Sequence, residues 1–498
     1  MKLRVTVAAM ALVGLTAATP PVNLPGPQAI SETDKSTGAK AHPEMMAEYG
    51  GAYIGPQATM VQRVGQRVAA QAGIANVGRD FTFTLLNSPV ENAFAIPGGY
   101  VYTTRALLAL MNNEDELAFV LGHETGHIAA HHSERRQQVT QRSVLLGTLG
   151  QAVLGGLLGN GAVGQIGSQL GQAGINRLVV GHVMAHSRGE EFEADDLGEI
   201  YMQKAGYNPA NASAMLASLA AQTGLESSLA GNARTTPGWA MSHPDPAARV
   251  SRALDRARQM GVGAPAGARA NEAFLLSLKG MTYDDDPKQG VIEGQVFTYP
   301  PDQLRFTAPA GYGMSNGADA VTISAKDSQV AGQARFTGGA YKGDLNAVLR
   351  SAFATLSKDG QSGAVTGTPT TIGGMPAMTA SARANGDTGS VDVTVVAIAV
   401  APGKAYAFTI VQPAGQGLGD LAPLISSLRR ISPAEAAAVR KRVVDVVRVG
   451  PKDTVASMAA RMAYRDAAVQ RFLVLNGLPD GTTRLAPGSM VKLIVWGR

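Results

Sequence analysis

Three residues of one short stretch, His123, Glu124 and His127, have the types and the spacing that a zinc hydrolase needs on one helix. Residues four apart lie one turn above each other, so both imidazoles can face a single cation. Glu124 follows the first histidine, where a carboxylate can take a proton from a metal-bound water. The stretch therefore predicts a site for one zinc ion per chain, with Glu124 as the general base.

A third protein ligand is needed, because catalytic zinc commonly has three protein ligands and one water. Four acidic residues of a later stretch are candidates: Glu190, Glu191, Glu193 and Asp195. If that stretch is helical, Glu191 and Asp195 share one face. One of these carboxylates can bind the metal while the other accepts a hydrogen bond from a ligand imidazole. The spacing alone allows either assignment of the two roles.

The elements that must position these residues follow from the hydrophobic pattern. Positions 58–71 carry apolar residues at helical spacing, whereas positions 81–85 alternate like a half-buried strand. A second strand is expected at 98–102. Asn112 or Asn113 can cap the helix that runs from there into the histidine motif. The metal ligands are thus expected on a buried helix, where rigid placement is easiest.

The N-terminus has the pattern of an export signal. Lys2 and Arg4 precede an apolar run that is too short to span a bilayer, and small residues follow it up to Ala18. We expect a signal peptide over 1–18, a periplasmic or other envelope destination, and a Pro-rich linker over 19–43. An uncleaved membrane anchor is the alternative. Since the chain has no cysteine, it has no disulfide, thiolate zinc ligand or catalytic thiol.

A glycine-rich segment without any charged residue extends from Ser143 to Asn176. Its glycine pairs at four-residue spacing would allow peripheral membrane contact through residues 144–176. However, the many glycines weaken any helix there. The simpler interpretation is a flap or helical hairpin over the site.

A chain of 498 residues is too long for one core and suggests about three domains. The first, a zinc metalloprotease domain at 44–260, ends at a linker rich in Gly, Pro and Ala. The second, at 271–432, has the pattern of an antiparallel sheet with helices, contains no histidine, and has no function that we can derive. The fold class is therefore predicted to be α+β.

The last segment, 445–498, has the predicted order strand, helix, helix, strand. Asp453 and Thr454 would cap the first helix, and Asn476-Gly477 follows the second. This order resembles a LysM carbohydrate-binding module, although Lys452 stands where such modules have glycine. The resemblance implies peptidoglycan as a partner, and the basic surplus of the segment favours an anionic one. A module that only packs against the protease is the alternative.

Several stretches together resemble the HtpX/BepA family of gluzincin endopeptidases, to which CAAX prenyl proteases are related. The resemblance covers roughly Glu44 to Arg258. It implies a mainly helical domain with a small sheet, Glu191 as the third zinc ligand and Asp195 as a supporting carboxylate. The matching stretches are Asn92–Phe94, Gly98–Val101, Asn113–Ala118, the histidine motif, Ser187-Arg188, Glu191–Asp195 and Ser242–Pro244.

His243 belongs to one of these matching stretches. In BepA-like relatives the histidine of this His-Pro element can reach the zinc and displace the water, so His243 is a candidate fourth, regulatory ligand, with Arg249 near the cleft. A loop histidine before a turn-forming proline is the alternative. The other histidines nearby are expected to support the ligands or to face solvent: His131, His132, His182 and His186.

The implied function is that of an exported zinc metalloendopeptidase for envelope protein quality control. Zinc-bound water, activated by Glu124, would hydrolyse peptide bonds of misfolded or unassembled proteins. The substrate backbone would add as a strand along the edge at Gly99–Tyr102. The rival is a latent protease that acts mainly as a periplasmic chaperone or a cell-wall-associated binding protein. No nucleic-acid partner is expected.

Overall fold

The structure is a computed structural model, and it describes residues 24–26, 28–135, 186–230, 238–262, 271–317, 320–326, 330–356, 365–386 and 389–497. The predicted signal peptide at 1–18, the uncharged segment at 143–176 and His182 lie outside these ranges. Among the helices within them, none combines the length and the apolar character that a membrane crossing requires.

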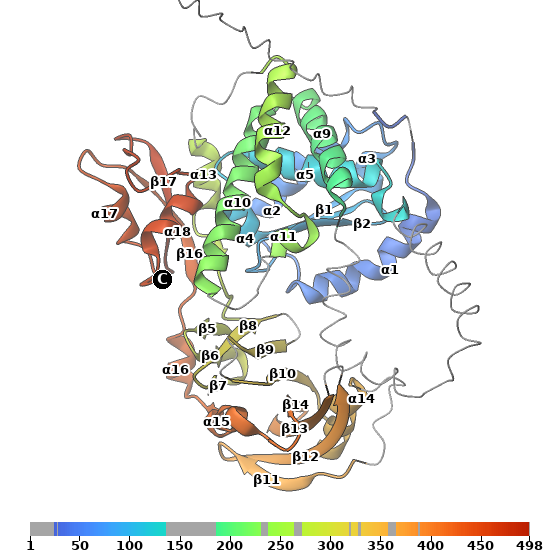
Figure 1. Ribbon diagram of the computed structural model, residues 1–498, viewed down its shortest axis with the longest axis vertical. Coiled ribbons are helices and arrows are strands. Elements are labelled where there is room, and N and C mark those ends of the chain that lie inside the picture. The colour runs from blue at the N-terminus through green and yellow to red at the C-terminus, as the bar shows by residue number, and fades with distance from the viewer. Residues whose placement is uncertain are drawn as a thin grey trace, which may run out of the picture.

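A first lobe made mainly of helices contains the predicted ligands (Figure 1). This confirms the expected helical domain with a small sheet. Its helices are α1 (Glu32–Glu48), α2 (Pro56–Ala69), α3 (Val77–Asp80), α4 (Arg105–Leu110), α5 (Glu114–Ala129), α9 (Arg188–Lys204), α10 (Ala210–Ala230), α11 (Gly238–Ser242), α12 (Pro246–Gln259) and α13 (Glu272–Leu278).

Helix α1 differs from the prediction for the N-terminal region. Residues 32–43, which were predicted to belong to a Pro-rich linker over 19–43, form most of this helix. Ser31 begins it, since its side chain accepts a hydrogen bond from the backbone N–H of Asp34. Pro43 lies inside the helix without ending it. The prolines that suggested a linker are concentrated before residue 28, upstream of this cap.

The small sheet of the first lobe has the strand order β1-β3-β2, with β1 at Thr82–Leu86, β2 at Ala93–Ile96 and β3 at Tyr100–Thr104. β3 pairs in parallel with β1 and antiparallel with β2. The strand expected at 98–102 therefore exists, but it lies in the middle of the sheet. Because its hydrogen-bonding groups are used on both sides, the expected addition of substrate at Gly99–Tyr102 is wrong. Within the described residues, β2 is an edge strand.

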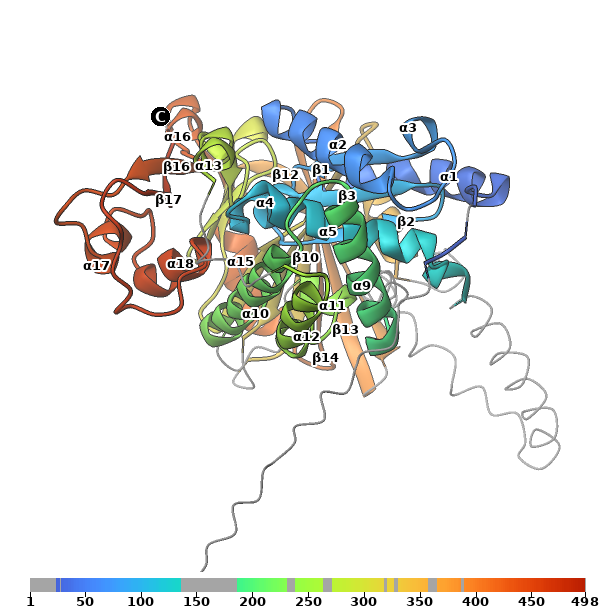
Figure 2. The same cartoon turned by 90° about the horizontal axis from the view of Figure 1, so that it is seen from above.

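Helices α5 and α9 carry most of the predicted site and lie against each other, with α2 on the other side of α5 (Figures 1 and 2). Asn113 caps α5 by accepting from the backbone N–H of Glu116. Ser187 and Glu190 form a capping box at the start of α9. The two helices approach closely at glycines: a Cβ atom on Gly198 would lie 2.8 Å from the backbone nitrogen of His123.

The second lobe consists of antiparallel sheets, as predicted, and lies below the first in Figure 1. A seven-stranded sheet has the order β11-β12-β13-β14-β10-β9-β8, and a four-stranded sheet the order β15-β7-β6-β5. The elements are β5 (Val291–Glu293), β6 (Val296–Tyr299), η1 (Pro300–Asp302), β7 (Leu304–Thr307), β8 (Tyr312–Asn316), β9 (Ala320–Ala325), β10 (Gln333–Ala340), α14 (Leu345–Ala354), β11 (Thr368–Ile372), β12 (Met375–Gly386), β13 (Gly389–Ala401), β14 (Lys404–Pro413), η2 (Gly419–Leu421), α15 (Ala422–Ser427), β15 (Arg429–Arg430) and α16 (Pro433–Ala437).

Both faces of the seven-stranded sheet are buried. Val395 and Ala397 of β13 pack with Leu349 of α14, whereas Val396 and Ile398 belong to the core on the other face. Successive residues of a strand point to opposite faces, so one continuous apolar run serves two cores.

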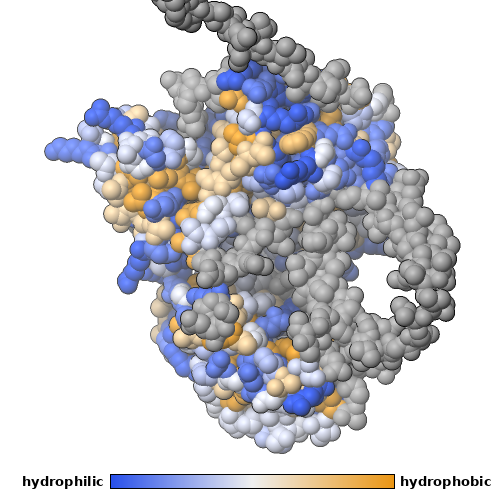
Figure 3. Space-filling model, in the orientation of Figure 1, coloured by the Kyte–Doolittle hydropathy of each residue, from blue (hydrophilic) through white to orange (hydrophobic). Residues whose placement is uncertain are grey.

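The C-terminal unit has the predicted order strand, helix, helix, strand: β16 (Arg442–Arg448), α17 (Val455–Ala459), α18 (Ala468–Leu475) and β17 (Met490–Trp496). β4 (Thr282–Tyr283) extends its sheet next to β16. Phe472 and Leu493 belong to the same hydrophobic core as Leu107 and Leu110 of α4. Hydrophobic residues are visible around this junction in Figure 3.

Candidate metal centre

Four side chains from three places in the first lobe converge. His123 and His127 come from α5, Glu191 comes from α9, and His243 follows α11. All four are buried, and one possible ligand atom of each lies within 4.8 Å of the others. The two histidines lie one turn apart on the side of α5 that faces α9, and Glu191 lies on the side of α9 that faces α5. Residues 64 or more positions apart in the sequence therefore meet here.

The distances between the candidate ligand atoms fit zinc. His123 Nε2 and His127 Nε2 are 3.0 Å apart. Glu191 Oε1 is 3.4 Å from His127 Nε2, and Glu191 Oε2 is 3.6 Å from His123 Nε2. Ligands bound at about 2.0–2.1 Å to one tetrahedral ion are separated by about 3.3 Å. Two imidazoles and a carboxylate are also a ligand set typical of catalytic zinc.

The other ring nitrogens of both histidines are engaged behind the cluster. His123 Nδ1 lies 2.9 Å from Asp195 Oδ1, and His127 Nδ1 lies 2.6 Å from Nδ1 of the buried His132. Hydrogen bonds at Nδ1 fix the tautomer in which Nε2 offers a lone pair to a metal. Because Asp195 faces the back of His123 and Glu191 faces both Nε2 atoms, the geometry favours Glu191 over Asp195 as the third ligand.

Arg249 of α12 is a part of the site that sequence reasoning placed only near the cleft. Its buried guanidinium donates to Asp195 at 2.6 and 2.7 Å and to Glu191 Oε2 at 2.5 Å. Burial raises the pKa of Glu191, but His243, His123 and Arg249 outweigh burial and hold this pKa well below its usual range. The only sequence signal was the position of Arg249 shortly after the His-Pro element.

Glu124 lies beside the cluster and is 1% exposed. Burial raises the pKa of its carboxyl group. Oε1 has no hydrogen-bond partner within the described residues and lies 3.3 Å from His243 Nε2. A buried carboxylate with a raised pKa and a free oxygen is suited to accept a proton.

His243 closes the fourth side of the cluster. Its Nδ1 lies 3.2 Å from His123 Nε2 and 3.1 Å from Glu191 Oε1, and its Nε2 lies 3.2 Å from the carbonyl oxygen of Ala93 on β2. The ring stacks on Trp239, with centroids 4.1 Å apart. The structure thus brings His243 into the metal cluster and against the edge strand.

The other histidines occupy different surroundings. His132 is buried behind His127, and its Nε2 lies 3.2 Å from Glu193. His186 stacks on His127 with ring centroids 3.6 Å apart. His131 is partly exposed and contacts Glu134. His132 and His186 thus support a ligand ring, which is the first of the two roles expected from the sequence.

Comparison with known proteins identifies this part of the chain. Residues 56–257 match the family profile described as peptidase family M48. Residues 56–257, called the M48 domain below, are thus similar to the peptidases of this family. Peptidases of this family depend on zinc, in agreement with the ligand set and distances in the M48 domain.

The matched relatives are proteases, and each of the matches below covers less than half of this chain. Two proteins named beta-barrel assembly-enhancing protease are similar: that of Yersinia pestis is 34% identical over 203 residues, and that of Escherichia coli K12 is 30% identical over 220 residues. These matches cover 40% and 44% of this chain. The chain spans only 39% and 42% of the length of these two relatives. The mitochondrial metalloendopeptidase OMA1 of Schizosaccharomyces pombe is 30% identical over 35% of this chain and 49% of its own length.

Replacing Arg249 in the M48 domain with Met is expected to weaken zinc binding by roughly 10- to 100-fold, because groups that orient ligands contribute this much to metal affinity. Arg249→Lys keeps the charge but loses the forked hydrogen bonds, so its zinc affinity should lie between those of the wild type and Arg249→Met. Zinc affinity is measured by competition with a coloured chelator, and folding of the metal-free variants by circular dichroism. Arg252→Met, which breaks a partly exposed ion pair with Asp196, is the control. Unchanged affinity in Arg249→Met would contradict this role.

Glu199, two turns after Glu191 on α9, predicts a pH dependence of M48 domain stability. It is 1% exposed, its Oε2 has no partner among the described residues, and burial raises its pKa to about 10. The folded state therefore retains a proton that the unfolded state loses near its ordinary pKa, so stability falls as the pH rises from that value towards 10. Relative to Glu199→Gln, the wild type should lose more than about 1 kcal/mol of unfolding free energy between pH 5 and pH 9. Urea unfolding at both pH values measures this, and parallel pH profiles would show that the carboxyl is not buried.

Proposed function

We propose that the chain is an exported zinc metalloendopeptidase that hydrolyses peptide bonds of misfolded or unassembled envelope proteins. The single observation that carries this proposal is that Glu124 lies 3.3 Å from His243, which clusters with His123, His127 and Glu191. A free, buried carboxylate oxygen beside a zinc-sized ligand set is the arrangement that metal-assisted hydrolysis requires. The M48 match supports the reaction type.

His123, His127 and Glu191 would hold the zinc. When bound, the metal supplies Lewis acidity, which polarises the scissile carbonyl and lowers the pKa of the attacking water. Glu124 would accept the proton of that water through its free oxygen and then deliver it to the leaving amine. Asp195 and Arg249 would keep His123 and Glu191 in position throughout.

The edge strand β2 would bind the substrate backbone. In the described residues β2 is paired only with β3, so one row of its N–H and C=O groups is available for an added strand. Such binding reads the main chain rather than the side chains, which suits unfolded polypeptide. His243 contacts the carbonyl of Ala93 on this strand, so substrate would have to displace it. We therefore propose His243 as a fourth, regulatory ligand that gates the site.

Destination and partners extend the proposal beyond the M48 domain. The export signal and the name of the bacterial relatives support an envelope location. The C-terminal unit would be a LysM-like module that binds peptidoglycan, although its burial against α4 favours a structural role as well. Retention of the full-length protein on purified peptidoglycan tests glycan binding, and passage through it unretained would remove that partner. Residues 144–176 would make peripheral membrane contact.

The rival function, a latent protease acting as a chaperone or binding protein, is favoured by one observation: His243 fills the fourth side of the cluster. Cleavage of casein by the wild type and by His243→Ala, with and without a chelator, separates the two. The proposed peptidase should cleave casein in a zinc-dependent way, and faster when His243 is absent. If neither protein cleaves casein while both suppress aggregation of an unfolded protein, the rival is correct.

A further inference from the structure

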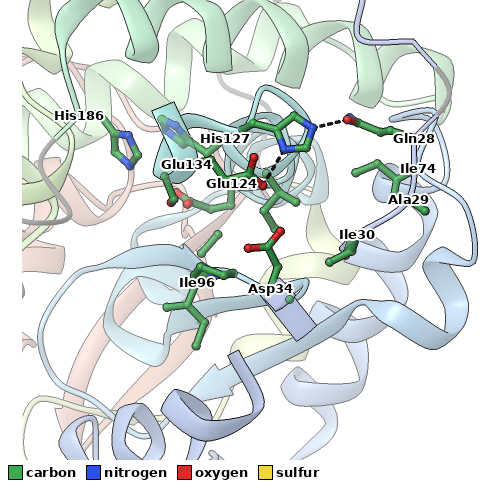
Figure 4. A pocket seen from close by; sticks show the side chains of 16 residues that line it. Gln28, Ala29, Ile30, Asp34, Ile74, Ile96, Glu124, His127, Glu134 and His186 are labelled. Atoms are coloured by element: carbon green, nitrogen blue, oxygen red, sulfur yellow. Dashed lines mark hydrogen bonds and ion pairs between the residues drawn. The ribbon is translucent and has the colours of Figure 1, made fainter. Parts of the chain in front are cut away.

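A pocket adjoins the metal centre on the side of α5 that faces the N-terminal segment (Figure 4). Glu124 and His127 form part of its wall, so it opens directly onto the reacting groups. The end of β2 and the turn after it form another part, and the N-terminal segment forms the opposite one. The lining residues from these last two parts are Ala95, Ile96, Pro97 and Gly98, and Gln28, Ala29, Ile30 and Asp34.

The N-terminal wall is held firmly. The backbone N–H of Gln28 donates to the carbonyl of Gly73, and its carbonyl accepts from the N–H of Ala75. Its side-chain amide donates to the carbonyl of Ala129, at the end of α5, at 2.8 Å. Ile30 is 9% exposed and belongs to the core of the first lobe. The segment before α1 is therefore a built wall of the pocket.

The inner surface of the pocket is largely aliphatic. Ile30, Ile74, Ile96 and Ile128 all line it, each from a different element or loop. Aliphatic walls of this kind favour the methylene stem of a long, unbranched side chain, because they remove apolar surface from water without offering hydrogen bonds.

The polar groups of the pocket include three carboxylates, together with the imidazoles of His127, His131 and His186. Asp34 and Glu134 line it in addition to Glu124; the carboxylate of Asp34 accepts a hydrogen bond from the hydroxyl of Ser31, and that of Glu134 lies 3.0 Å from His131 Nδ1. Among the described lining residues there is no lysine or arginine. Lys35, the cation next to Asp34 in sequence, is bound to Glu32 and Asp80. Carboxylates beside low-dielectric walls create a negative potential that attracts a cation.

We propose that this pocket is a substrate subsite that selects a lysine or arginine side chain next to the scissile bond. The methylene stem would lie on the isoleucines, and the cationic end would reach Asp34 and Glu134. Glu124 and His127, which form part of the pocket wall, fix the position of the pocket relative to the reaction. This inference rests on the proposed peptidase function and adds the class of substrate side chain.

Quenched-fluorescent peptides that differ at a single position test the proposal. The residue on either side of the scissile bond is varied between lysine, norleucine and glutamate, and kcat/KM is measured with the wild type and with His243→Ala. On one side of the bond, lysine should exceed norleucine by roughly two- to fivefold, the size expected for partly exposed ion pairs, and glutamate should be poorest. In Asp34→Asn/Glu134→Gln the lysine-to-norleucine ratio should fall to about one. Asp255→Asn, an exposed carboxylate of α12, should keep the ratio.

A binding measurement makes the test independent of turnover. Fluorescence anisotropy with Glu124→Gln and the same labelled peptides should give the same order of affinities. If norleucine equals or exceeds lysine at both positions while casein is cleaved, the subsite proposal is wrong and the peptidase function stands. If the lysine preference persists in the double variant, the two carboxylates are not its cause and the proposal also fails. Absence of any cleavage with wild type and His243→Ala would instead refute the peptidase function.

Discussion

Glu124→Gln is expected to lower kcat/KM for casein by roughly 10²- to 10⁴-fold, the usual contribution of a general base. The amide has nearly the shape of the carboxylate but cannot accept the proton of the attacking water. Oε1 of Glu124 has no hydrogen-bond partner within the described residues, and its 3.3 Å contact with His243 Nε2 is one that the amide oxygen of glutamine can keep. Initial rates of cleavage of fluorescein-labelled casein measure the loss.

Zinc content and thermal unfolding provide the control for this variant. Both should stay close to the wild type, because Glu124 is not among the clustered ligand candidates. Glu134 is a partly exposed residue of the same region, and Glu134→Gln should cleave casein at a rate within a few-fold of the wild type. A side chain at the rim of the pocket affects which substrate sequence is preferred more than it affects the proton transfer. Activity of Glu124→Gln near that of the wild type would show that another group is the base.

Lys492→Met is expected to destabilise the protein by about 3–5 kcal/mol, the range observed when one partner of a buried charged contact is removed. Lys492 of β17 is fully buried, and its ammonium donates to the carbonyls of Ala109, Leu110 and Met111 at the end of α4. Methionine fills similar space but leaves these acceptors unsatisfied. Glu116 at the start of α5 would also lose the positive charge of Lys492, which lowers its pKa against the effect of burial. Urea unfolding followed by circular dichroism measures the change.

The exposed Lys452 of the same C-terminal unit offers a matched control, and Lys452→Met should change stability by less than about 0.5 kcal/mol. Adding Glu116→Gln to Lys492→Met should recover part of the loss, because it removes the uncompensated carboxylate. If Lys492→Met unfolds at the same urea concentration as the wild type, the C-terminal unit is not anchored in the first lobe in this way.

The local part of the site could be predicted from the sequence because it depends on helix periodicity. His123, Glu124 and His127 lie within two turns of α5, and the Asn113 cap precedes them by less than three turns. The same periodicity placed Glu191 and Asp195 on one face of α9. It could not distinguish their roles, since that depends on which side of His123 each carboxylate faces.

Contacts between distant segments could not be predicted from local patterns. The alternation at 98–102 predicts a strand, but not that β1 and β2 pair on both sides of it. Lys492 lies between two apolar residues of a strand. This pattern does not show that a carbonyl group of α4 accepts a hydrogen bond from its ammonium. The pocket wall at Gln28 was missed for the same reason, because its partners lie near Gly73 and Ala129.

The most direct test of the account is the zinc content of purified protein, measured by atomic emission together with casein cleavage. The wild type should contain one zinc per chain, and Glu191→Ala should lose both the metal and the activity, while Glu193→Ala, whose carboxylate contacts His132 rather than the cluster, should keep both. Wild-type protein without stoichiometric zinc, or a Glu191→Ala variant that retains metal and cleavage, would contradict the central claim.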